Sequence, residues 1–108
     1  MSVLSADEIR AGIEKVKAEY AKLPDRSAFG TDNKGSCEAI IAALEKAAKA
    51  ADDGELDKWW IEEEVGVLYE EGEREAEDDG GEVIDQPSSK AAEALQWITG
   101  DMDPPFSE

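Results

Sequence analysis

Large apolar side chains are scarce in this sequence, and their scarcity limits the core that the chain can build. Val, Ile, Leu and Phe together account for 20 of the 108 residues, whereas alanine alone accounts for 16. The formal net charge at pH 7 is −17. Chains with so few large apolar residues and so much charge approach the composition of disordered proteins. A fold therefore requires a periodic arrangement of the apolar residues, and we expect a small, alanine-rich core.

The start of the chain carries the clearest helical pattern. Ser5 followed by Glu8 is a capping box, in which each side chain accepts a hydrogen bond from the backbone N–H of the other residue. The sequence predicts a first helix over residues 6–22, closed by the proline that follows. Apolar residues recur along it at helical spacing: Ile9, Ile13, Val16, Tyr20 and Leu23.

Three further helices are expected from the same kind of pattern. Ser36 is a candidate cap for a second helix, which ends at the turn-forming residues 52–54. The composition of residues 55–79 predicts a long third helix, because the helix-favouring residues Glu, Leu, Arg and Ala dominate the segment. Ser88 or Ser89 is expected to cap the last helix.

The middle of the third segment leaves an alternative open. Gly66 and Gly72 each cost about 1 kcal/mol relative to alanine in the interior of a helix. The run Val65–Tyr69 is also typical of a β-strand, which can pair with Glu82–Asp85 as a hairpin. The sequence thus predicts an all-α bundle of about four helices with a long acidic third helix, and the alternative is an α+β fold with this hairpin.

The length of the chain fits one domain rather than two. We expect residues 1–108 to form a single acidic helical domain with an extended tail over residues 101–108, where two adjacent prolines favour polyproline geometry. The start, Met1–Asp7, lacks the basic and apolar stretches of a signal peptide. The longest apolar run, Ala39–Leu44, is too short to cross a bilayer, so a cytoplasmic location is expected.

The residue types that most catalytic and metal sites require are missing. The chain has no histidine and a single cysteine, Cys37. This composition excludes Ser-His-Asp and Cys-His catalysis, His-ligated zinc and an internal disulfide. Carboxylates occur throughout the chain and single out no acid–base pair. We therefore expect a protein that is not an enzyme, with no catalytic residue, metal site or cofactor.

Nearly all of the negative charge lies in the second half of the chain. Residues 1–54 contain 10 acidic and 8 basic residues, whereas residues 55–108 contain 18 acidic and 3 basic residues. This charge repels phosphate, so neither direct nucleic-acid binding nor binding to an anionic membrane is expected. A basic protein is the expected partner, since electrostatic steering accelerates its association with an acidic surface.

The third predicted helix separates an apolar face from an acidic one. The apolar face runs from Ile61 to Ala76, and the opposite face carries two stripes of acidic residues at seven-residue spacing. Tryptophan in a charged rim is a common anchor at protein interfaces, whereas buried tryptophans would leave the acids as a solvated face. The candidate partner-binding residues are Trp59, Trp60, Glu63, Glu64, Val67, Glu70, Glu71, Glu77 and Asp78.

The acidic face suggests a function. Carboxylates one helical turn apart are about 5–6 Å from each other at Cβ, comparable to the step between phosphates along a DNA strand. In size, acidity and helical pattern the chain resembles two functional classes: phage-encoded inhibitors that imitate DNA against restriction or CRISPR machinery, and acidic immunity proteins that block toxin nucleases. The sequence favours an inhibitor that covers the basic nucleic-acid-binding surface of a partner. A non-inhibitory interaction or assembly protein, whose charge maintains solubility, is the alternative.

Overall fold

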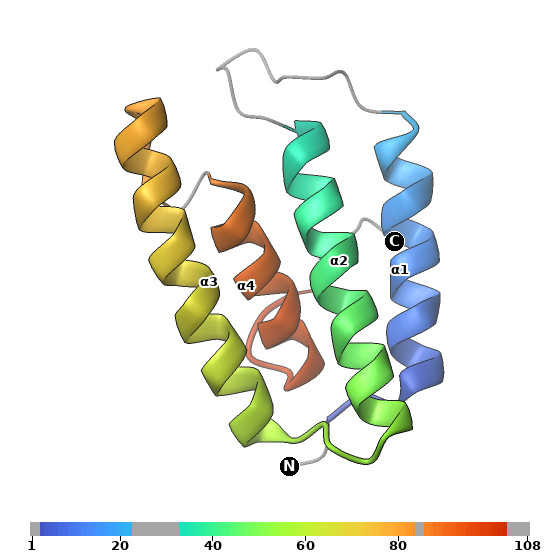
Figure 1. Ribbon diagram of the computed structural model, residues 1–108. Coiled ribbons are helices and arrows are strands. Elements are labelled where there is room, and N and C mark those ends of the chain that lie inside the picture. Colours follow the sequence, from blue (N-terminus) through green and yellow to red (C-terminus); the bar gives the residue numbers. More distant parts are fainter. Residues whose placement is uncertain (1–2, 23–32, 84–85, 104–108) are drawn as a thin grey trace.

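The computed structural model describes residues 3–22, 33–83 and 86–103, and these residues form a helical bundle without strands (Figure 1). The helices are α1 (Ala6–Tyr20), α2 (Asn33–Asp52), α3 (Lys58–Asp79) and α4 (Pro87–Ile98). The prediction of a small all-α bundle with a long acidic third helix is therefore confirmed.

The hairpin alternative is wrong for its first strand. Val65–Tyr69 lies inside α3, where Val65 is buried and Val67 is 51% exposed. A strand would place these two valines on the same face, whereas a helix separates them. The second proposed strand, Glu82–Asp85, lies partly outside the described residues, as does most of the extended tail predicted for residues 101–108.

Helix α4 occupies the middle of the bundle. It packs against α2 on one side and against α3 on the other, and α1 covers the outer side of α2 (Figure 1). The helices are thus ordered α1, α2, α4 and α3 across the molecule. Helices α2 and α3 flank α4 but do not pack extensively against each other, so the space between them is bounded by α4.

The core is small and rich in alanine, as expected. Its largest fully buried apolar side chains are Ile9, Val16, Leu44, Ile61, Leu95 and Ile98. Alanines fill many of the remaining core positions of α2 and α4, and five of them are at most 2% exposed: Ala47, Ala48, Ala91, Ala92 and Ala94. Because alanine adds little volume, neighbouring helices approach closely at these positions.

Helix α1 begins where the sequence predicts. The Ser5 hydroxyl accepts a hydrogen bond from the N–H of Glu8, and the Glu8 carboxylate accepts one from the N–H of Ser5, both at 3.2 Å. The helix ends at Tyr20, two residues before the predicted end. The guanidinium of Arg10 binds both carboxylate oxygens of Asp52, which joins α1 to the end of α2.

The predicted start of the second helix is wrong. Helix α2 begins at Asn33, so Ser36 lies inside the first turn rather than at the cap. Ser36 is buried, and its hydroxyl has no hydrogen-bond partner in the described part of the chain. The beginning of α2 contacts Tyr20 of α1 in two places. The ammonium group of Lys34 lies 5.5 Å from the ring centroid, and the phenol donates a hydrogen bond to Glu38 at 2.8 Å.

The fourth helix also begins differently from the prediction. Pro87 is its first residue, a position where the missing N–H and fixed φ of proline suit a helix. Ser88 and Ser89 therefore lie in the first turn and do not cap it. The residue at the cap, Gln86, makes no side-chain cap hydrogen bond. The N–H groups of this turn, which have no partner within the helix, therefore require one from elsewhere in the fold.

Candidate protein-binding surface

Helix α3 presents the predicted acidic face. It carries ten acidic and two basic residues. The Asp57 carboxylate caps its start by accepting a hydrogen bond from the N–H of Trp60 at 2.8 Å. Gly80 ends it in the left-handed conformation, with φ of 74°. The predicted apolar face packs toward α4, with Ile61, Val65, Gly72 and Ala76 buried.

The two acidic stripes lie in different environments. The first stripe, here called the outer stripe, consists of Trp59, Glu63, Glu70 and Glu77. Trp59 is 70% exposed, and the three glutamates are exposed. None of the three forms an ion pair within the described residues. The outer stripe therefore combines one exposed aromatic side chain with uncompensated negative charge.

The second stripe lies toward α2 and is called the inner stripe. It consists of Trp60, Glu64, Val67, Glu71 and Asp78. Trp60 is half-buried against the core, Val67 is half-exposed, and Glu71 and Asp78 are exposed. The structure thus separates the two adjacent tryptophans: only Trp59 is freely available as an anchor.

Two carboxylates of the inner stripe contact other helices. Glu64 is 25% exposed, and its Oε2 atom lies 2.9 Å from Nζ of Lys46, an ion pair that connects α3 to α2. The Ser88 hydroxyl of α4 lies 3.5 Å from Oε2 of Glu71, at the limit of a hydrogen bond. Not every acid on this face is therefore available to a partner.

A contact that the sequence did not predict joins Glu75 of α3 to the start of α4. Its Oε1 atom accepts a hydrogen bond from the backbone N–H of Ser88 at 3.1 Å, and its Oε2 atom accepts one from the Ser88 hydroxyl at 3.0 Å. A carboxylate on α3 thus caps the N-terminus of α4 and interacts favourably with the helix dipole. No local pattern predicts this, because the two residues belong to different helices.

A groove runs between α2 and α3, over α4. Its volume is about 330 Å³. The apolar lining comes from three helices: Ala39, Ala42 and Ala43 of α2, Trp60, Val67 and Leu68 of α3, and Leu95 of α4. Lys46, Glu64, Glu71 and Ser88 supply the polar lining. The groove brings four of the predicted residues, Trp60, Glu64, Val67 and Glu71, together with α2 alanines that the sequence did not single out.

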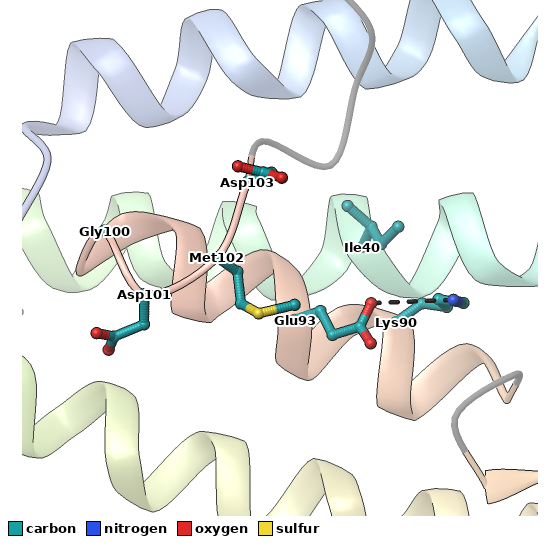
Figure 2. Close-up of a pocket in the computed structure, with 7 residues that line it drawn as sticks. All are labelled: Ile40, Lys90, Glu93, Gly100, Asp101, Met102 and Asp103. Atoms are coloured by element: carbon teal, nitrogen blue, oxygen red, sulfur yellow. Dashed lines mark ion pairs between the residues drawn. The ribbon is translucent and has the colours of Figure 1, made fainter.

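A second hollow, of about 480 Å³, lies where the segment after α4 crosses the bundle. Figure 2 shows Met102 extending toward Glu93, with Lys90 beside it and Ile40 of α2 opposite. The Lys90 ammonium and a Glu93 carboxylate oxygen lie 3.9 Å apart. Its other polar side chains are those of Asp101 and Asp103, so acidic groups outnumber the single lysine in this lining.

Chemically reactive groups are not prominent in the described residues. Burial raises the pKa of the Cys37 thiol, and the nearby carboxylates of Glu19 and Glu38 raise it further, which disfavours the reactive thiolate. No group of three or more Cys, Asp or Glu side chains in the described ranges is placed to hold a metal ion. None of the described helices is both long enough and apolar enough to cross a membrane.

Comparison with known proteins supplies no identity. No protein-family model, curated protein or solved structure matches this chain.

Proposed function

We propose that this protein is an acidic inhibitor that binds a basic, nucleic-acid-binding surface of a partner protein and covers it. The observation that supports the proposal is the outer stripe, where a 70% exposed Trp59 lies on the same face as three exposed glutamates that form no ion pair with any described residue. Carboxylates without cations attract a basic surface, and an exposed indole ring supplies apolar contact once the surfaces meet.

The spacing of the exposed acids supports nucleic-acid imitation. Glu70, Glu73 and Glu77 are exposed and lie about one turn apart on α3. The Cβ atoms of successive members of this set are therefore about 5–6 Å apart, and together they form a row of negative charge along the helix. Such a row can occupy the positions that phosphates take on a nucleic-acid-binding surface, without the bases that carry sequence information.

A capture experiment with competition tests the proposal. The protein is immobilised and incubated with nuclease-treated bacterial lysate, and bound proteins are eluted with an excess of duplex DNA. We expect basic nucleic-acid-binding proteins to be captured and then released by the DNA. Capture that DNA does not compete would contradict a shared binding surface and would favour the non-inhibitory interaction protein.

A charge-matched pair of variants locates the surface. Replacing Glu63, Glu70 and Glu77 with Lys reverses the outer stripe and should abolish the DNA-competed capture. The control variant replaces Glu14, Asp53 and Glu55, three exposed acids outside α3, with Lys and changes the net charge by the same amount. Equal loss of capture by both variants would show that net charge alone, rather than the outer stripe, is responsible.

A further inference from the structure

We propose that the groove between α2 and α3 is the docking site for an amphipathic α-helix of the partner protein, with basic residues along the edge that faces α3. The inference rests on the proposed function for the basic character of the partner. It adds a second contact region, adjacent to the outer stripe, and a defined type of element that occupies it.

Both walls of the groove present residues at the spacing of a helix face. Ala39, Ala42 and Ala43 follow one another at i, i+3 and i+4 on α2, and Lys46 follows at i+7. Trp60, Glu64, Val67, Leu68 and Glu71 are related in the same way on α3. Side chains in such rows form the ridges and grooves by which helices pack on one another, and Ala42 and Val67 of these rows are exposed.

The walls favour a helix over an extended peptide. All elements around the groove are helices, whose backbone hydrogen bonds are formed internally, so they offer no free sheet edge to a strand. An incoming helix also satisfies its own backbone groups and needs only side-chain contacts. The alanines of α2 permit close approach, and Trp60 and Val67 provide apolar surface for anchors spaced at i, i+3, i+4 and i+7.

The charge of the groove selects a basic occupant. Lys46 is the one cation in the described lining, and Glu64 already neutralises it at 2.9 Å. Glu71 remains exposed, and among the described residues its carboxylate has only the Ser88 hydroxyl, at 3.5 Å, as a hydrogen-bond partner. A Lys or Arg on the docked helix can pair with it. A second copy of this chain, with a net charge of −17, is instead repelled.

Synthetic peptides test the docking site directly. The probe is a Leu/Lys peptide of about 15 residues with leucines on one helical face, long enough to form a helix. A Leu/Glu peptide has the same apolar face and opposite charge, and a scrambled Leu/Lys peptide has the same charge without an apolar face. Affinity is measured by fluorescence anisotropy, and the site by changes in amide NMR shifts. We expect only the amphipathic Leu/Lys peptide to bind, with shifts centred on residues 39–46 and 60–71.

Two exposed alanines provide a matched pair of variants. Ala42→Lys places bulk and positive charge in the groove and should weaken peptide binding by about tenfold or more, because the new ammonium group must be desolvated beside a basic ligand. Ala18→Lys makes the same change on α1, away from the groove, and should leave the affinity unchanged. Circular dichroism confirms that both variants retain the helical fold.

Four results would overturn the proposal. The first two concern the peptides: no binding of the amphipathic Leu/Lys peptide, or equal binding of the Leu/Glu peptide. The other two concern the variants: equal affinity of the two lysine variants, or self-association that Ala42→Lys abolishes, which would assign the groove to a second copy. These experiments distinguish failure of the docking site from failure of the proposed function. Failure of DNA to release captured proteins contradicts the function alone, whereas failure of the peptide to bind contradicts only the docking site.

Discussion

Two glycines in the interior of α3 lie in opposite environments, and exchanging each for alanine measures how closely α3 and α4 pack. Gly66 is exposed, and a Cβ atom there would meet no other atom within 4 Å. Gly72 is buried, and a Cβ atom there would overlap the hydroxyl oxygen of Ser89 on α4. The intrinsic helix preference is the same at both positions, so any difference in stability reports the contact with α4.

The expected magnitudes follow from this geometry. Alanine is about 0.5–1 kcal/mol better than glycine in a helix interior, so Gly66→Ala should stabilise the protein by about that amount. Gly72→Ala gains the same helix preference, but the new methyl group overfills the contact with Ser89 of α4, which costs about 1–3 kcal/mol. The two variants should therefore differ by about 1–3 kcal/mol in the free energy of unfolding, or by roughly 4–8 °C in Tm for each kcal/mol.

Urea denaturation followed by circular dichroism provides the measurement, and a double mutant provides the control. The Ser89 hydroxyl is buried and has no hydrogen-bond partner within the described residues, so Ser89→Ala should be tolerated. With the hydroxyl removed, a Cβ at Gly72 lies 3.6 Å from the Cβ of residue 89, an ordinary contact. Gly72→Ala combined with Ser89→Ala should thus recover the lost stability. If Gly72→Ala alone is as stable as Gly66→Ala, the hydroxyl rotates aside without cost and the argument fails.

Three further predictions concern individual contacts. Ser5→Ala removes half of the capping box and should lower the free energy of unfolding by about 1 kcal/mol; an unchanged urea midpoint would contradict the observed helix start. Glu75→Ala should cost about 1 kcal/mol by removing the cap of α4, whereas Glu77→Ala, on the exposed outer stripe, should change stability little in the same urea assay. The hydrogen bond from Arg10 holds the pKa of Asp52 below its ordinary value, so this ion pair stabilises the fold above the unfolded pKa of about 3.9. Its contribution is lost as pH falls through the lower folded value, and the unfolding free energies of wild type and Asp52→Asn should converge there; a pH-independent difference would contradict this assignment.

The features that the sequence predicted well depend on local interactions. The start of α1 was predicted correctly because a capping box involves residues three positions apart, Ser5 and Glu8. The apolar face of α3 was also predicted correctly, since periodicity alone separates Ile61 and Ala76 from the acids. The competing strand at Val65–Tyr69 failed because a short apolar run does not distinguish a strand from a buried helix.

Both helix starts that were predicted incorrectly lie beside a residue from another helix. Lys34, in the first turn of α2, lies 5.5 Å from the ring centroid of Tyr20 of α1. Helix α4 begins at Pro87, with its first turn capped by Glu75 from α3. At the start of α4 serine was the strongest local signal, but the carboxylate of Glu75 from α3 takes the capping role.

The residues of the candidate site could be predicted from the sequence, but their exposure and the groove beside them could not. The sequence placed Trp59 and Trp60 together, and their different exposure follows from the position of α3 against α4. The groove depends on the order in which α2, α4 and α3 pack, which no local pattern determines. One sequence signal was informative in retrospect: the run Ala39–Leu44 is apolar on more than one face, which is typical of a helix that contacts more than one neighbour.

The difference between the two stripes bears on why this chain concentrates its charge. Glutamates seven residues apart are offset by only about 20° on a helix, so each stripe follows the axis, and the stripes face different surroundings. Glu64 of the inner stripe joins two helices, and its charge has a role in the fold. Glu63, Glu70 and Glu77 have no such contact within the described residues. Glu73 lies one turn from both Glu70 and Glu77, and like charges one turn apart on a helix cost a few tenths of a kcal/mol per pair. Solubility requires net charge but not its collection on one helix face around an exposed tryptophan. Attraction to a localised basic surface does require that arrangement, and for this reason we favour a binding role over a solubilising role for the outer stripe.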